Sequence, residues 1–143
     1  MSTRSVPSKR FPLRKLQKYT RLIHDAVYPM ACCWESSLML RDLLLIRGFE
    51  DFDPKVVTVT VHGCDEHCVV LCGDYICDAT AWQFAKGDSW VVTRGGDARC
   101  EYVMSGNPDY DETIERLQGC VGFEEALDNG CLDEDRVKAL LAS

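Results

Sequence analysis

No run of apolar residues in this 143-residue chain is long enough for a membrane-spanning helix. The longest such run is interrupted by Arg41 and Asp42. The N-terminus also lacks the apolar core of a secretory signal. These absences argue against a membrane protein and favour one that stays in the cytoplasm or acts in a cytosol.

Positive charge is scarce beyond the first 21 residues. The chain holds 16 Lys and Arg against 23 Asp and Glu, a formal net charge of −7. Residues 1 to 21 contain 7 of the basic residues and no acidic one, which leaves 9 basic and 23 acidic residues, a net charge of −14, for the rest. This balance argues against general nucleic-acid binding and would suit a basic protein partner.

Disulfide staples are not expected, although the chain has nine cysteines. Their number is odd, and they fall within apolar, periodic segments rather than between them, which favours reduced thiols. The chain is also long enough to bury a core without staples or metal. We expect a flexible basic arm over residues 1 to 12 and a single domain over residues 13 to 143.

Hydrophobic periodicity predicts an α+β fold. Apolar residues at helical spacing from Leu13 to Val27 predict a first helix, whose basic face is either a solvated surface or an organelle-targeting segment. Alternating Val and Thr over 57–61 predict a strand with one buried face. Runs over 67–72 and 75–78 on either side of Gly73-Asp74 predict a hairpin.

The remaining segments complete a mainly antiparallel sheet and add C-terminal helices. Residues 90–93 and 100–104 are expected to be strands, and 79–84 an extended segment. An acidic helix follows Pro108, with Asp111 and Glu112 in its first turn and Ile114 and Leu117 at helical spacing. A last helix, capped by Asp133, is expected to run through Leu141.

The stretch from Pro29 to Gly48 predicts a buried central helix, led by proline and closed by glycine. Its few charges leave most of its surface apolar. We expect the core contacts of this helix to come from Leu38, Leu45 and Ile46. Ser36 and Ser37 are small enough to let a strand backbone come close.

Cys32 and Cys33 fall in the first turn of this helix. Unpaired backbone N–H groups and the positive end of the helix dipole favour a thiolate there, so a nucleophile is one interpretation. The alternative is a pair of small buried apolar residues, the common fate of free cysteine. Position in the helix does not separate Cys32 from Cys33 as the nucleophile.

The predicted hairpin places a histidine near a carboxylate. If Gly73 and Asp74 form the loop, Cys72 pairs with Tyr75, and His67 and Asp78 become diagonal neighbours on one face. At that spacing the carboxylate accepts the imidazole N–H. A shift of one residue in the turn would put the two side chains on opposite faces.

Together these predictions supply the parts of a thiol-based catalytic site. Cys33 would be the nucleophile, His67 would take its proton or pair with the thiolate, and Asp78 would orient the ring and stabilise the imidazolium. Such chemistry needs no cofactor.

The motifs around these residues resemble those of papain-like cysteine hydrolases. They comprise a helix beginning Cys33-Trp34 with small residues a turn later, His67 before a β-rich run, and Asp78-x-Thr80-Ala81-x-Gln83-Phe84. The chain is most similar to small bacterial papain-fold deamidase and toxin domains, which share their core with transglutaminases. The similarity spans residues 29 to 84.

This resemblance implies a papain-like fold in which a central N-terminal helix packs on an antiparallel sheet. It also implies the catalytic roles given above for Cys33, His67 and Asp78. The implied reaction is glutamine deamidation of a protein substrate, by an effector that stays cytoplasmic or is delivered into a target-cell cytosol. Proteolysis by the same three residues is the alternative.

One departure from papain concerns the oxyanion hole. Papain has a glutamine six residues before its cysteine, whereas this chain has Val27. Backbone donors at Cys33 would then carry more of the oxyanion stabilisation. Gln83 is the nearest amide downstream, and we expect it to brace the segment after Asp78.

Two other classes of function fit parts of the sequence. The first is a structural zinc site, for which the chain offers the ligand types His62, Cys64, His67 and Cys68, with Cys72 and Cys77 nearby. The spacing does not suit zinc, because His67 and Cys68 are adjacent in a strand and point to opposite faces. The sequence also has no second ligand pair separated from the first by the usual loop. A non-catalytic interaction module, with an acidic surface and packed cysteines, is the other alternative. Metal content and thiol reactivity distinguish these classes.

Overall fold

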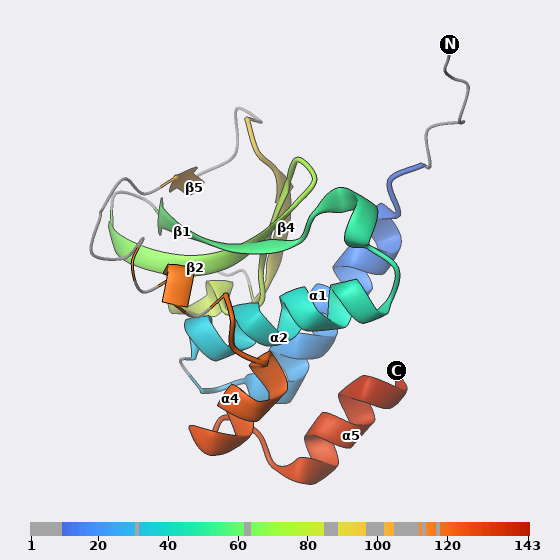
Figure 1. Ribbon diagram of the computed structural model, residues 1–143. Helices are drawn as coiled ribbons and strands as arrows, with labels where there is room; N and C mark the ends of the chain where they lie inside the picture. Colours follow the sequence, from blue (N-terminus) through green and yellow to red (C-terminus); the bar gives the residue numbers. More distant parts are fainter. Residues whose placement is uncertain are drawn as a thin grey trace.

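The computed structural model describes residues 10–30, 32–61, 64–84, 89–96, 102–104, 112, 114–116 and 118–143, with only the backbone described at 64–66. The fold is α+β, as predicted: a curled antiparallel sheet lies against the N-terminal helices, and the C-terminal helices pack on those helices (Figure 1). The elements are α1 (Leu13–Val27), α2 (Cys33–Ile46), η1 (Glu50–Phe52), β1 (Lys55–Val61), β2 (Cys64–Cys72), β3 (Tyr75–Asp78), η2 (Ala81–Gln83), β4 (Val91–Arg94), β5 (Tyr102–Met104), α4 (Gly122–Asp128) and α5 (Glu134–Ala142).

The sheet has the order β4-β3-β2-β1-β5, and every neighbouring pair is antiparallel. Cys72 pairs with Tyr75, which confirms the predicted register of the β2–β3 hairpin. A register shift between Val59 and Val61 marks an irregularity in β1, a feature that increases local twist.

The two faces of the sheet meet different surroundings. One face packs on the helices through residues that include Val56, Cys68 and Val70. The other face lines the inside of the curl, where Val59 and Val69 form a second cluster. The prediction that β1 has one buried face is therefore wrong: Val56 and Thr58, on the helix side, are 2% and 5% exposed.

Helix α2 is central, because it contacts α1, α4, β1 and β2. It begins at Cys33 rather than directly after Pro29, and Gly48 follows its end with φ +89°. The predicted close contact with a strand is present, since Ser37 Oγ donates to the Cys68 carbonyl at 3.0 Å.

Two of the three predicted core contacts of α2 are wrong. Leu38 is buried, but Leu45 and Ile46 are 43% and 56% exposed. These two residues lie in the last turn of the helix, while Leu43 and Leu44 fill the core instead.

Helix α4 was not predicted, and it packs closely on α2. A Cβ atom on Gly122 would lie 2.4 Å from the backbone carbonyl carbon of Leu38, so only glycine allows this approach. Gly122 begins α4, and its N–H donates to Asp42 Oδ2 at 2.7 Å. The helix start is difficult to predict from the sequence, because a glycine ordinarily indicates a loop.

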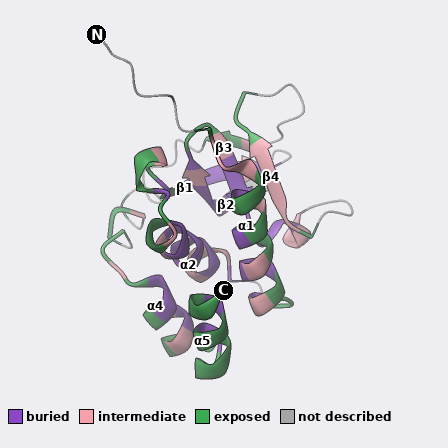
Figure 2. Ribbon diagram, turned by 90° about the vertical axis from the view of Figure 1, so that its right-hand side faces the viewer, coloured by how far each residue is buried: buried purple, intermediate pink, exposed green. Residues whose placement is uncertain are grey.

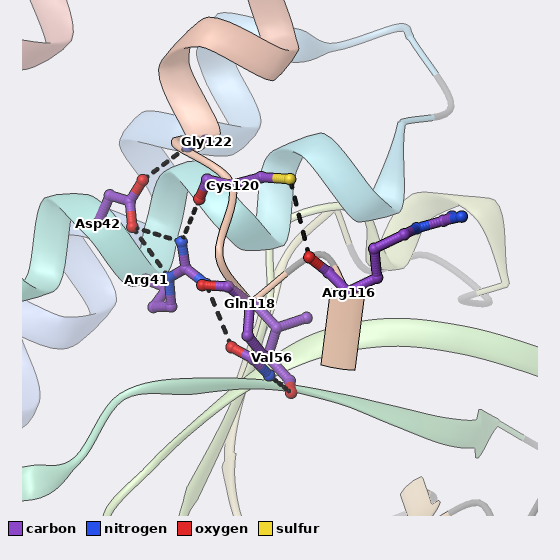
Figure 3. Close-up of polar contacts among 7 residues, drawn as sticks. All are labelled: Arg41, Asp42, Val56, Arg116, Gln118, Cys120 and Gly122. Atoms are coloured by element: carbon purple, nitrogen blue, oxygen red, sulfur yellow. Dashed lines mark hydrogen bonds and ion pairs between the residues drawn. The ribbon is translucent and has the colours of Figure 1, made fainter. Parts of the chain in front are cut away.

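Arg41, which interrupts the apolar run in the sequence, is buried and links α2 to the segment before α4. Its guanidinium donates to the carbonyls of Gln118 and Cys120 at 3.1 and 2.8 Å and pairs with Asp42 (Figure 3). Gln118 in turn donates to the Val56 carbonyl at 2.9 Å. The network therefore ties α2 to β1 and to the segment before α4.

The packed part of the chain begins before residue 13. Phe11, placed in the arm by sequence, stacks on Tyr75 with ring centroids 4.7 Å apart and meets Phe52 edge-on at 4.8 Å. The rest of the predicted arm, up to residue 9, lies outside the described residues.

The terminal helices follow the sequence prediction in part. α1 has the predicted bounds, and Asp133 caps α5 by accepting from the Arg136 N–H at 2.9 Å. The outward sides of α4 and α5 are exposed (Figure 2). In the predicted acidic helix, residues 114–116 are helical, whereas Asp111 and Leu117 lie outside the described residues.

The prediction of an extended segment after β3 is wrong, because residues 81–83 form the 3₁₀-helix η2. Asp78 Oδ1 accepts from the Thr80 N–H at 3.0 Å, a local turn that bends the chain away from the sheet.

None of the helices in the described part of the chain combines the length and the apolar character that a membrane-spanning helix needs.

Candidate active site

The three predicted site residues come from three different elements. Cys33 is the first residue of α2, His67 lies within β2, and Asp78 is the last residue of β3. His67 and Asp78 are each only 1% exposed, whereas Cys33 is half-buried. The thiol thus lies nearest to solvent, with the two polar side chains behind it.

His67 and Asp78 are in direct contact. His67 Nε2 and Asp78 Oδ2 lie 2.8 Å apart, as the predicted hairpin register requires. A carboxylate only accepts hydrogen bonds, so Nε2 carries the hydrogen. Nδ1 is then the nitrogen left to exchange a proton, and it is buried without a hydrogen-bond partner among the described residues.

Cys33 is close enough to act on the His67 ring. Burial alone would lower the pKa of His67, but the hydrogen bond to Asp78, together with the influence of the neighbouring Cys33, raises it to about 9. Nδ1 itself accepts or donates no hydrogen bond among the described residues, and catalytic hydrogen bonds are often long in unliganded sites. The arrangement favours a protonated ring beside the thiol.

Asp78 is held on both carboxylate oxygens. Oδ1 accepts from the Thr80 N–H at 3.0 Å and lies 3.4 Å from the Thr80 hydroxyl. Oδ2, which faces His67, also accepts from the Tyr102 hydroxyl at 2.7 Å. These donors give a buried carboxyl group hydrogen-bond partners on both of its oxygens.

Sequence reasoning missed Tyr102 and the position of Phe84. Tyr102 is in β5, and its role depends on the curl of the sheet, for which no local sequence signal exists. Phe84, noted only as part of a motif, lies against the His67 ring with centroids 4.6 Å apart and an interplanar angle of 63°. It covers the imidazole and restricts its orientation.

The two adjacent cysteines occupy different environments. Cys32 is 7% exposed and belongs to the main core, with Sγ 3.4 Å from Ser36 Oγ. Burial raises the pKa of the Cys32 thiol. The geometry therefore favours Cys33 over Cys32 as the nucleophile.

Four other described thiols are also poorly suited to reaction. Burial raises the pKa of Cys72 and of Cys131 to about 12 and moves the pKa of Cys68 and Cys77 upward as well. All seven described cysteines are free. Cys64 and Cys100 are not among them, because their side chains lie outside the described part.

The sequence raises two positions in connection with an oxyanion hole, Val27 and Gln83. Val27 is fully buried in α1, consistent with a packing role. Gln83 Nε2 is buried and has no hydrogen-bond partner among the described residues, so this nitrogen does not brace the segment after Asp78. The backbone N–H groups at the start of α2 remain the expected donors.

The described residues contain no cluster of three or more His, Cys, Asp or Glu side chains that could hold a metal ion. Of the four proposed zinc ligands, His62 and the side chain of Cys64 lie outside the description. His67 contacts Asp78, while Cys68 packs with Leu38 on the opposite face of the sheet.

Comparison of the chain with protein-family models, with curated proteins and with solved structures finds no match.

Proposed function

We propose that the protein is a cysteine-dependent amide hydrolase or acyl transferase of the papain-like type. The observation that carries this proposal is the contact of His67 Nε2 with Asp78 Oδ2, which leaves Nδ1 without a partner among the described residues, while Cys33 acts on the same ring. A buried histidine with one nitrogen held by a carboxylate, the other nitrogen available and a thiol beside the ring is suited to nucleophilic catalysis.

The proposed reaction is deamidation of a glutamine side chain in a protein substrate. The Cys33 thiolate attacks the carboxamide carbon, and the oxyanion is stabilised by backbone N–H groups at the start of α2. The His67 imidazolium gives its proton to the departing nitrogen, so that ammonia leaves and a thioester forms. Water, deprotonated by His67, then attacks the thioester, which releases the glutamate product and regenerates the Cys33 thiolate and the His67 imidazolium.

The short connections near the candidate site favour a side chain over a peptide bond as the substrate. A protease that grips an extended peptide needs a long cleft with two walls. The connections described between α2 and η2 are short and offer little chain from which to build such walls. A shallow site that receives one protruding carboxamide fits these connections better.

The test is mass spectrometry of cytosolic proteins exposed to the natural protein, to Cys33→Ser and to the matched control Cys32→Ser. We expect Gln-to-Glu conversions and released ammonia with the natural protein and with Cys32→Ser, and neither with Cys33→Ser. New N-termini that depend on Cys33, without ammonia, would make the protein a protease. Retention of activity in Cys33→Ser would contradict the catalytic proposal.

A further inference from the structure

Tyr102 reaches Asp78 across the inside of the sheet. The two residues belong to β5 and β3, which are separated in the sheet by β1 and β2. The Tyr102 hydroxyl nevertheless donates to Asp78 Oδ2 at 2.7 Å. The curl visible in Figure 1 brings the edge strand β5 over the face that carries His67 and Asp78.

This contact is made at the carboxylate oxygen that faces His67. Oδ2 accepts from both Tyr102 and His67 Nε2, at 2.7 and 2.8 Å. The other oxygen, Oδ1, is already oriented by the Thr80 N–H. The Thr80 N–H therefore orients the carboxylate even without Tyr102. The specific effect of the Tyr102 hydroxyl is to weaken the interaction of Asp78 Oδ2 with the imidazole.

We infer that Tyr102 is a positioning residue of the proposed site, whose hydroxyl shares Asp78 Oδ2 with His67 and so limits how strongly Asp78 holds the His67 proton. The inference rests on the proposed function. Two donors on one oxygen compete for the same charge, so each bond is weaker than it would be alone. An imidazolium held less strongly is a better acid toward the leaving nitrogen.

The described groups that face this pair come from α2, β2, β3, β5 and the segment around η2. His67 faces Asp78 from β3 and Cys33 from α2, with Phe84 as an apolar cover. Asp78 faces His67 from β2, Tyr102 from β5 and Thr80 from the turn before η2. It also acts on the neighbouring thiols Cys68 and Cys77, whose pKa its charge helps to raise, after the larger effect of burial.

The experiment compares Tyr102→Phe with Tyr75→Phe. Tyr75 is on the same strand as Asp78, but its ring stacks on Phe11 outside the site, so its variant controls for the loss of one tyrosine hydroxyl. The His67 titration is followed by NMR of the imidazole carbons in both variants and in the natural protein. The chain has only three histidines, which simplifies the assignment.

We expect Tyr102→Phe to move the His67 titration midpoint upward by roughly half a pH unit and to lower kcat about tenfold with KM unchanged. Tyr75→Phe should change none of these. A midpoint that stays in place or falls in folded Tyr102→Phe would overturn the inference. Because the titration needs no turnover, this failure is distinct from failure of the proposed function, which would appear as unaltered activity in Cys33→Ser.

Discussion

The ring of Phe84 lies edge-on to the imidazole of His67, with centroids 4.6 Å apart at an interplanar angle of 63°. Phe84 directly follows η2, so the turn that begins at Asp78 leads the chain back to a position where the Phe84 ring packs on His67. The segment from Asp78 to Phe84 thus supplies both a carboxylate for one ring nitrogen and an apolar wall for the ring.

Phe84→Leu should keep the apolar cover but remove the aromatic contact. We expect the free energy of unfolding to fall by about 1 kcal/mol and the rate of Cys33 alkylation to fall several-fold, because the His67 ring is less restricted. Urea unfolding and timed iodoacetamide labelling measure the two effects. Phe11→Leu, which alters a ring pair outside the site, should lower stability similarly and leave labelling unchanged. Equal labelling in both variants would show that Phe84 only packs.

The His67–Asp78 pair predicts a pH-dependent stability. The pKa of His67 is raised to about 9 from the ordinary value of 6.5, because contacts with Asp78 and Cys33 outweigh burial. The imidazolium therefore stabilises the folded state fully below about pH 6.5, and this contribution is lost as the pH rises through about 9.

Asp78→Asn is the variant that tests this dependence. It should destabilise the protein by on the order of 3 kcal/mol near pH 6, because it leaves a buried histidine without its carboxylate. The difference from the natural protein should shrink as the pH approaches 9. Urea unfolding at several pH values, with reductant present, provides the measurement. A difference that stays constant over this range would contradict the raised pKa.

Gly122→Ala should separate α4 from α2. The added Cβ would lie 2.4 Å from backbone atoms of Leu38 and Met39, which cannot move aside as a side chain would. We expect a loss of about 1 to 3 kcal/mol in the free energy of unfolding. Gly119→Ala is the matched control, since its Cβ would meet nothing closer than 3.9 Å and should change stability little. Equal unfolding midpoints for the two variants would refute this packing.

Deleting residues 1 to 10 should leave both the fold and the thiol reactivity intact. The packed part of the chain includes Phe11, whose ring meets Tyr75 and Phe52. Phe11→Ala in the full chain should therefore lower the free energy of unfolding by about 1 to 3 kcal/mol, less than for a fully buried ring. Thermal unfolding of the deletion variant and of Phe11→Ala measures the two effects. A Tm that falls after the deletion but not after Phe11→Ala would show that the arm packs instead.

The local part of the candidate site was predictable. Gly73 and Asp74 form a two-residue loop, and a loop of known length sets the pairing of Cys72 with Tyr75 and hence the shared face of His67 and Asp78. Errors arose where tertiary contacts outweigh local pattern. Leu45 and Ile46 have the same apolar character as Leu43 and Leu44, and only the placement of neighbouring elements decides which pair is buried.

The α+β composition, the hairpin register and the position of the cysteine pair near the start of the central helix could be predicted, because these depend on periodicity, turn residues and helix ends. Three features follow from tertiary packing alone: Cys32 is a core residue, Arg41 is buried and links α2 to the segment before α4, and Tyr102 shares a carboxylate oxygen with His67. These contacts join residues that are 20 or more positions apart or that lie in different elements. They depend on how the sheet curls and how α4 packs, which no short stretch of sequence encodes.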